Sequence, residues 1–381
     1  MTAYLDNSAT TRPGASVAAL MKELPESGWY NPSALYRPAL EIQKRMDQVR
    51  EICLKAAGAE GYRIVFTSGG TESDNLALIG ALKARRKPGK VLMSSVEHPA
   101  VSACAEELQR MGYRVAAIPA VREGTLDLRK LEEEADGETV LISVMQVNNE
   151  TGATEPLEKI IAIRNRKCPD AAIHVDGVQG FLRVPIRLRR LGIQSYALSA
   201  HKIHGLKGTG ALMLAPGYTV KPLLFGGGQE GNLRSGTENT AGILALGAAV
   251  EEWQEADSER IRGLKIRLWK ALKEKIPEAE VNGPEPEDGA PHILNVAFEP
   301  VRSQTMLFAL EGDGVYVSAG SACASRKQKI SPVLRAMGTD PARADCSLRF
   351  SLGRETTEDE IDYAAERAAF HYRVLKKYTR R

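Results

Sequence analysis

Short apolar runs alternate with amphipathic, helix-like stretches through the first two thirds of the chain. Helix-like stretches such as Glu72–Ala84 and Leu157–Arg166 separate these runs. Strands that alternate with helices of this length predict βαβ units and a mostly parallel sheet. The runs are almost continuously apolar, which is typical of strands covered on both faces. The expected strands are Arg63–Phe66, Lys90–Ser95, Tyr113–Ile118, Thr139–Val147, Ala172–Asp176, Ser195–Ser199 and Gly210–Leu214.

The pattern changes after about Gly228. Thr240–Ile276 is expected to be helical with a break near residues 256–258, and Thr357–Tyr378 is expected to form a closing helix. Ser347–Leu352 alternates polar and apolar residues, so a half-buried strand is expected there. The other elements expected in this part are strands at Ile293–Phe298 and Val315–Ser318 and a helix at Ser303–Leu310.

The length of 381 residues suggests about two to three domains, or one large domain with a smaller companion. We predict a large domain from residues 15–252 and a smaller α+β domain from residues 1–14 and 253–381. A chain of this length can bury a large core without disulfide or metal support.

Charge and cysteine usage exclude several classes of function. The 51 basic and 48 acidic residues leave a net charge of +3, too balanced for nucleic acid as the main partner. The N-terminus does not resemble a signal peptide, and the apolar stretch 241–250 is too short to cross a bilayer. The five cysteines are scattered without a Cys-x-x-Cys pair, so we expect no metal site and reduced thiols in the cytoplasm.

The segment Thr67–Asn75, with the sequence TSGGTESDN, lies between an expected strand and an expected helix. Its glycines allow a tight turn, and backbone N–H groups with the Ser68 and Thr71 hydroxyls would form an anion site at the helix N-terminus. The alternative is an ordinary helix cap at Thr71. The segment is not a nucleotide P-loop, because no Gly-Lys-Ser/Thr follows it.

Two polar groups follow expected strands near the middle of the chain. Asp176 ends an apolar strand, where ligands collect in parallel sheets, although a helix cap is the alternative. Lys202 follows the next strand and could form a Schiff base. Lys207 is a rival for that role. A metal pair formed by His201 and His204 lacks an evident third ligand.

The last third of the chain carries a cysteine and an arginine of interest. Cys323 lies in a run of Ser, Ala and Gly that is expected to open and close easily. Arg326 and Lys327 follow it and favour a thiolate. Arg349 shares a strand face with two serines and suits a substrate carboxylate, with a structural ion pair as the alternative. The remaining cysteines are expected to be inert: Cys53, Cys104, Cys168 and Cys346.

A phosphate site, a strand-end aspartate, a lysine and a carboxylate-binding arginine together fit pyridoxal phosphate (PLP). With the added cysteine, the chain resembles the NifS/IscS-type cysteine desulfurases of the class V aminotransferase group. The resemblance runs from Tyr4 to Arg354. It implies an α/β fold, PLP-dependent transferase fold type I. The motifs that carry it are Tyr4–Thr11, Phe66–Asn75, Val96–His98, Val147–Gly152, His174–Gln179, Ser199–Lys202, Gly226–Glu230, Arg234–Asn239 and Gly320–Cys323.

The resemblance also implies how the cofactor is held. Lys202 would carry PLP, Asp176 would pair with the pyridine nitrogen, and Gln179 would contact the ring hydroxyl. His98 would stack on the ring and move protons. Thr237 would reach the phosphate from the second subunit of a homodimer. The phosphate ligands from the same subunit would be Gly70, Thr71, Ser199 and His201.

For the substrate, the resemblance implies that Asn149 and Arg349 orient L-cysteine. Cys323 would attack its sulfur, giving a Cys323 persulfide and alanine. The sulfur would pass to an acceptor protein, either an Fe–S scaffold or a thiolation enzyme, in the cytoplasm, with no direct role for nucleic acid or membranes. The alternatives are an ordinary PLP aminotransferase, a selenocysteine lyase and a catalytically silent protein of the same fold.

Overall fold

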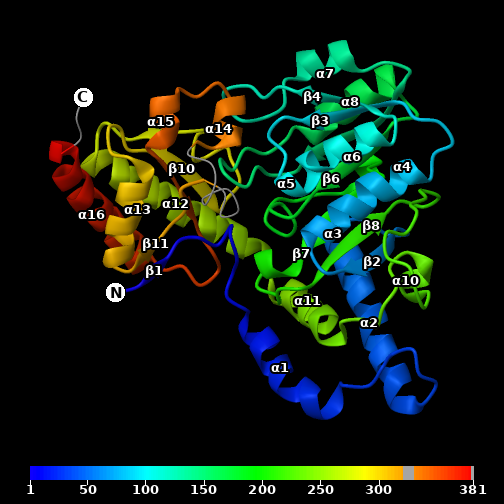
Figure 1. The fold of residues 1–381 in the computed structure, drawn as a ribbon. Helices are drawn as coiled ribbons and strands as arrows, with labels where there is room; N and C mark the ends of the chain where they lie inside the picture. Colours follow the sequence, from blue (N-terminus) through cyan, green and yellow to red (C-terminus); the bar gives the residue numbers. More distant parts are fainter. Residues whose placement is uncertain (321–329, 379–381) are drawn as a thin grey trace.

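The computed structural model describes residues 1–320 and 330–378 of the chain. Within these residues the largest sheet has seven strands (Figure 1). From edge to edge they are β2 (Arg63–Thr67), β8 (Gly210–Leu214), β7 (Ser195–Ser199), β6 (Ala172–Asp176), β5 (Thr139–Met145), β3 (Lys90–Ser94) and β4 (Arg114–Ile118). The pairs from β7 to β4 are parallel, which confirms the predicted mostly parallel sheet.

The last predicted strand of this series, β8, runs antiparallel to both of its neighbours. A parallel return would need a crossover of a dozen or more residues. Residues 200–209, which join β7 to β8, contain only a 3-10 turn at Ala200–Lys202. This short connection therefore lies at the C-terminal end of β7, beside the ends of β5 and β6.

Alternate residues of the strands face opposite sides of the sheet, and both sides are buried. On β5, Ile142 and Val144 pack with one apolar cluster and Leu141 packs with another. The first cluster includes residues of α2 (Arg37–Ala56), α8 (Leu157–Lys167) and α11 (Thr240–Glu252). The second includes residues of α6 (Cys104–Arg110), and of α4 (Ala81–Lys83) with the π-helical turn before it. The strands are almost continuously apolar because helices cover both faces of the sheet.

The predicted helix over Glu72–Ala84 forms in three connected parts: α3 (Gly70–Asn75), a π-helical turn (Leu76–Gly80) and α4. The long helical stretch breaks slightly earlier than predicted, at Trp253, between α11 and α12 (Glu255–Lys275). Gln254 and Asp257 form a reciprocal capping box that begins α12. The remaining helices on this side are α1 (Ala15–Ser27), α5 (Pro99–Ser102), α7 (Leu128–Glu134), α9 (Leu188–Leu191) and α10 (Gln229–Asn232).

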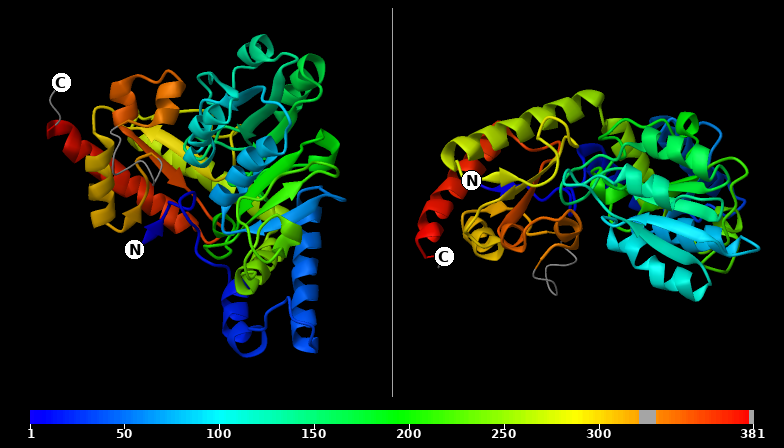
Figure 2. Two further views of the ribbon diagram at one scale, coloured as in Figure 1. Left: turned by 45° about the vertical axis from the view of Figure 1, so that its right-hand side comes forward. Right: turned by 90° about the horizontal axis from the view of Figure 1, so that it is seen from above.

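A smaller antiparallel sheet has the order β12 (Ser347–Ser351), β10 (Ile293–Ala297), β9 (Glu280–Val281). β1 (Ala3–Tyr4) pairs beside it with β11 (Val315–Tyr316). Ala3 packs in the same apolar cluster as residues of α12 and α16 (Glu358–Leu375). Figure 2 shows α12 leading from the large sheet to the smaller one. The other helices here are α13 (Ser303–Gly312), α14 (Pro332–Ala336) and α15 (Pro341–Asp345).

The strand expected at residues 347–352 forms as β12, but the expectation that it is half-buried is wrong, because all five residues of β12 are buried. Leu348 and Phe350 face the apolar cluster. The polar face is covered as well, by the N-terminal segment, whose Ser8 N–H donates to the Ser351 Oγ atom at 2.8 Å. No helix of the described residues is long and apolar enough to cross a membrane.

Candidate active site

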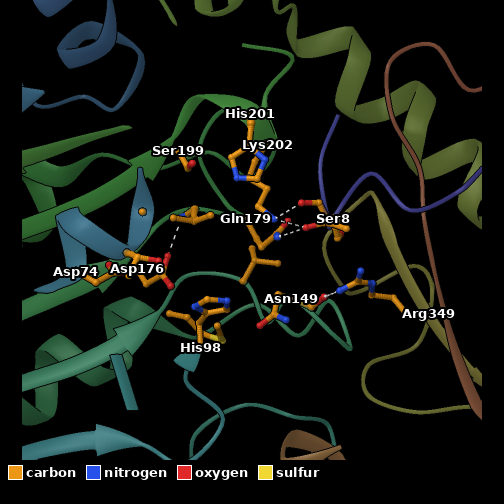
Figure 3. Close-up of a pocket in the computed structure, with 16 residues that line it drawn as sticks. Ser8, Asp74, His98, Asn149, Asp176, Gln179, Ser199, His201, Lys202 and Arg349 are labelled. Atoms are coloured by element: carbon orange, nitrogen blue, oxygen red, sulfur yellow. Dashed lines mark hydrogen bonds between the residues drawn. The ribbon is translucent and has the colours of Figure 1, made fainter. Parts of the chain in front are cut away.

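A cavity of about 240 Å³ lies where the C-terminal ends of β5, β6 and β7 face β12 and the N-terminal segment (Figure 3). Residues from six of the motifs meet there, together with Met145 and Arg349. The residues expected to hold the cofactor or the substrate line it, apart from Thr237, whereas Ser68 of the expected anion site does not. The lining residues are Ser8, Ala9, Gly70, Thr71, Asp74, His98, Met145, Val147, Asn149, Asp176, Val178, Gln179, Ser199, His201, Lys202 and Arg349.

Lys202 ends the short 3-10 turn after β7, and its side chain enters the cavity. Its Nζ atom donates to the backbone oxygens of Ser8 at 2.5 Å and Ala9 at 2.9 Å. The rival lysine, Lys207, is exposed to solvent and does not line the cavity. Geometry therefore favours Lys202 as the amine that would bind a carbonyl compound here.

Asp176 is the last residue of β6 and is buried at the floor of the cavity. Its Oδ1 atom accepts a hydrogen bond from the Val178 N–H at 2.9 Å, within a turn rather than at a helix cap. Burial, followed by the nearby Asp74 carboxyl, raises the pKa of Asp176. A cationic group of a ligand would remove that penalty. The site therefore suits a protonated ring nitrogen.

His98 precedes α5 and faces the same cavity. Its Nδ1 atom accepts a hydrogen bond from the Ala100 N–H at 3.1 Å, so the neutral ring carries its proton on Nε2. Burial lowers the pKa of His98, although Asp176 opposes this shift. A neutral imidazole of this kind can stack on a planar ligand and exchange a proton.

The glycine-rich turn before α3 forms one side of the cavity. A Cβ atom on Gly70 would lie 2.6 Å from the Cγ2 atom of Val178, so only glycine allows this approach. The helix begins after Gly69 without a side-chain cap, so the alternative of a Thr71 cap is wrong. Gly70 and Thr71 instead lie beside Ser199 and His201 in the cavity lining. These donors fit a phosphate group.

His201 and His204, the possible metal pair, form separate contacts with the N-terminal segment. His201 lies within hydrogen-bond distance of the Thr10 hydroxyl, at 3.1 Å, and burial lowers its pKa to about 4. His204 bonds the backbone oxygen of Arg12 at 2.9 Å and does not line the cavity. The described residues contain no group of three His, Cys, Asp or Glu side chains able to hold a metal.

Arg349 forms the opposite wall from the middle of β12 and is almost fully buried. It donates from Nη1 to the Asn149 backbone oxygen at 2.8 Å and from Nη2 to the Asp6 carboxylate at 2.6 Å. Its Nε–H has no hydrogen-bond partner among the residues that the structure describes. The structural ion pair therefore forms with Asp6, yet the Nε–H of Arg349 is still able to donate to a ligand. Arg354 pairs elsewhere, with Glu252 and Asp257.

Thr237, a described residue with a predicted role, does not line the cavity. Thr237 is exposed on the loop before α11. Cys323 lies outside the described residues. Gly320 directly precedes the segment, and Ser331 is the second described residue after it. Both lie near Glu150: the Ser331 hydroxyl donates to the Glu150 carboxylate at 2.5 Å, and a Cβ atom on Gly320 would lie 3.8 Å from it. Glu150 follows the cavity residue Asn149, so the described residues on either side of the segment lie near the cavity.

The four described cysteines, Cys53, Cys104, Cys168 and Cys346, are all buried as free thiols. Burial raises the pKa of Cys53 to about 12 and that of Cys346 to about 11. It raises the pKa of the other two thiols as well. The prediction that these cysteines are inert agrees with this environment, because a buried protonated thiol is a poor nucleophile.

Several residues near the site were not predicted. Asp74 lies on the inner face of α3, within 3.3 Å of the buried His174 ring. Ser8 lies within the motif Tyr4–Thr11, but the sequence indicates no role for it. Arg183 and His292 lie behind the cavity, against Gln179. A helical spacing of four from Gly70 could have indicated Asp74, whereas no local pattern marks His292.

Comparisons with known proteins agree with this geometry. The aminotransferase class-V family matches residues 3–364. "Cysteine desulfurase 2" of Trichormus variabilis is 40% identical over 361 residues, covering 94% of this chain and 90% of that protein. A solved NifS-like protein is 33% identical with a TM-score of 0.90, covering 98% of this chain and all of that one. The structure "SspA in complex with cysteine" is 32% identical with a TM-score of 0.79, covering 93% and 100% of the two chains.

Proposed function

The chain belongs to the aminotransferase class-V family and, within it, to the cysteine desulfurases, and we propose that it moves the sulfur of L-cysteine onto Cys323 with PLP held by Lys202. One observation carries the proposal. A single cavity brings together a lysine amine, a buried carboxylate, a neutral imidazole and a buried guanidinium, contributed by Lys202, Asp176, His98 and Arg349.

The residues present fit this cofactor. Asp176 would pair its carboxylate with the ring nitrogen, and the Gly70 turn with Ser199 and His201 would hold the phosphate. When bound, PLP supplies an electron sink next to the amino acid. His98 lines the same cavity and would exchange its Nε2 proton with the substrate. Gln179 presents its side-chain amide to the ring hydroxyl.

Arg349 and Asn149 orient the substrate carboxylate from the opposite wall. The buried guanidinium is fixed by Asp6 and by the Asn149 backbone, so little freedom is lost when substrate binds. The Nε–H of Arg349 remains available for a carboxylate oxygen.

The thiolate of Cys323 then attacks the sulfur of the bound substrate. A sulfur–sulfur bond forms as the carbon–sulfur bond breaks, and the electron pair of the broken bond stays on the substrate carbon. Protonation of that carbon gives alanine, and the sulfur remains as a Cys323 persulfide. An acceptor protein, such as an Fe–S scaffold or a thiolation enzyme in the cytoplasm, would take it.

The proposal includes a homodimer with composite sites. Thr237 is exposed, as expected for a residue that would reach the phosphate of a second subunit. The same region exposes Phe225 by 82% and Leu224 by 45%. Large exposed apolar side chains of this kind are typical of a surface that another chain covers.

Product analysis of the Cys323→Ala variant tests the function. The intact enzyme should convert L-cysteine to alanine and place one extra sulfur atom on Cys323, measured by mass spectrometry after one turnover. Cys323→Ala should keep the visible band of the bound cofactor and lose alanine production by at least about 100-fold. Cys168→Ala is the matched control and should remain active.

Two outcomes would contradict the proposal. Extra sulfur found on Cys168 or Cys346 would show that Cys323 is not the nucleophile. Transfer of the amino group to an acceptor, with a keto acid as the product and full activity in Cys323→Ala, would show an ordinary aminotransferase.

A further inference from the structure

A hydrogen-bond network lies behind the cavity and joins two cofactor-binding turns. The Gln179 side chain donates from Nε2 to the Ser8 backbone oxygen at 3.0 Å, and Lys202 donates to the same oxygen (Figure 3). On the other side, Arg183 donates from Nη1 to the Gln179 Oε1 atom at 3.4 Å and from Nη2 to the Lys202 backbone oxygen. Arg183 therefore ties the turn after β6 to the turn after β7.

The chemistry of the partners fixes the orientation of the Gln179 amide. A guanidinium can only donate hydrogen bonds, and a backbone oxygen can only accept them. The amide oxygen must therefore face Arg183, and the amide nitrogen must face Ser8. His292, the residue before β10, lies with Nε2 3.2 Å from the same oxygen, so it must donate its proton there.

This orientation leaves one N–H of Gln179 for the cavity. The amide nitrogen carries two protons, and the Ser8 backbone oxygen takes one. Gln179 lines the cavity, so an acceptor on a ligand can take the other. A flipped amide would instead present its oxygen and repel a phenolate.

Arg183 and His292 are both buried, and neither forms an ion pair with a described carboxylate. Burial lowers the pKa of Arg183 to about 9, so its guanidinium remains charged at neutral pH. Burial and the neighbouring cations Arg183, Lys265, Arg349 and Lys202 lower the pKa of His292, which keeps its ring neutral. The Gln179 amide oxygen therefore accepts hydrogen bonds from a cation, Arg183, and from a neutral ring, His292.

We propose that Arg183 and His292 are positioning residues that fix the Gln179 amide so that its remaining N–H meets the ring hydroxyl oxygen of the bound cofactor. The inference rests on the proposed function. The positive charge of Arg183 also lies near the cofactor site, because Arg183 donates to the backbone oxygen of Lys202, the lysine that would bind the cofactor. The other charged or titratable groups that face the cavity are Asp74, His98, Asp176, His201, Lys202 and Arg349.

A pH titration of the visible absorbance band of the bound cofactor tests this role independently of turnover. A nearby cation and a donor to the ring oxygen both favour the deprotonated, more negative form of the bound cofactor. Arg183→Met should therefore move the titration midpoint upward by about one pH unit, a tenfold change in the proton equilibrium. Arg183→Lys keeps the charge and should give a smaller shift in the same direction. The matched control Arg190→Met changes an exposed arginine and should titrate like the wild type.

His292 provides a second test should Arg183→Met fail to fold. His292→Leu removes the donor to Gln179 and should also raise the midpoint, whereas His292→Gln keeps a donor and should stay near the wild type. Wild-type midpoints in folded Arg183→Met, or in both His292 variants, would overturn the inference. A wild-type protein without a band that borohydride fixes to Lys202 would instead defeat the proposed function.

Discussion

The cavity has two walls, and they are built in different ways. The cofactor wall consists of strand ends of the seven-stranded sheet, with Asp176 at the end of β6 and Lys202 in the turn after β7. The substrate wall consists of Arg349, from the middle of β12, and the N-terminal segment around Asp6 and Ser8. The first wall follows from parallel sheet topology, which gathers strand ends at one edge.

The second wall depends on contacts between distant parts of the chain. Asp6 and Arg349 are 343 positions apart, yet the partly buried Asp6 forms an ion pair with the buried Arg349. Gly320, the last described residue before the segment that carries Cys323, lies near Glu150, which follows the cavity residue Asn149. The difference suggests a division of labour. The sheet fixes the cofactor, and the substrate wall joins the two ends of the chain around the reacting molecule.

The largest effect is expected on the cofactor wall, from Lys202→Ala. Without the amine no covalent link to the cofactor can form, so activity should fall by on the order of 10³-fold or more. Borohydride reduction followed by mass spectrometry should find no cofactor attached to the variant. Lys207→Ala, at an exposed lysine five residues later, is the control and should keep both the cofactor and the activity. Cofactor found attached to Lys207 would mean that the cofactor lysine does not lie on the cofactor wall, and the comparison of the two walls would fail.

A smaller effect is expected on the substrate wall. Arg349→Ala removes a charge-assisted contact to the substrate carboxylate worth roughly 1.5–3 kcal/mol, so kcat/KM for cysteine should fall about ten- to a hundredfold. The visible band of the cofactor should remain, because the cofactor wall is intact. Arg349→Lys should recover part of the loss, since it keeps the charge without the planar fork.

Arg354→Ala is the control for this variant. Arg354 pairs with Glu252 and Asp257 and does not line the cavity, so kcat/KM should hardly change. Equal losses in the Arg349 and Arg354 variants would mean that both act on the fold alone. Loss of the cofactor band in Arg349→Ala would show that the two walls are not separable.

The same contrast explains what the sequence could predict. β6, β7 and β8 were predicted to the residue because apolar runs covered on both faces have clear ends. The strand-end groups Asp176 and Lys202 followed from that pattern. The antiparallel direction of β8 and the full burial of β12 did not, because both depend on which distant segments lie alongside. Most individual roles, including that of Cys323, came from resemblance to a family.

The contacts behind the cavity were beyond reach for the same reason. His292 meets Gln179 across 113 positions of sequence, and neither residue has a local pattern that indicates the other. The domain division at residue 253 stays a prediction. The packing of Ala3 and Leu5 with residues from Ile261 onward is consistent with it.

The smallest effect concerns stability on the cofactor wall, measured on protein from which the cofactor has been removed. Burial and Asp74 raise the pKa of Asp176 from 3.8 to about 7 in the folded state. A raised pKa means that the folded state keeps a proton that the unfolded chain has lost. Its contribution to stability is therefore complete below pH 4 and is lost as pH rises through about 7. At pH 8 the folded protein holds a buried, charged carboxylate.

Asp176→Asn removes that charge. The cofactor-free variant should therefore be more stable than the cofactor-free wild type at pH 8, by about 1–3 kcal/mol, and should show little advantage at pH 4. Urea denaturation at the two pH values measures the difference, and Asp170→Asn, at an exposed aspartate, should show none. Addition of PLP should reverse the order, because only the wild-type carboxylate can pair with a protonated ring nitrogen. Identical pH dependence in Asp176→Asn and the wild type would mean that the strand-end carboxylate carries no such strain, and the electrostatic distinction between the two walls would fail.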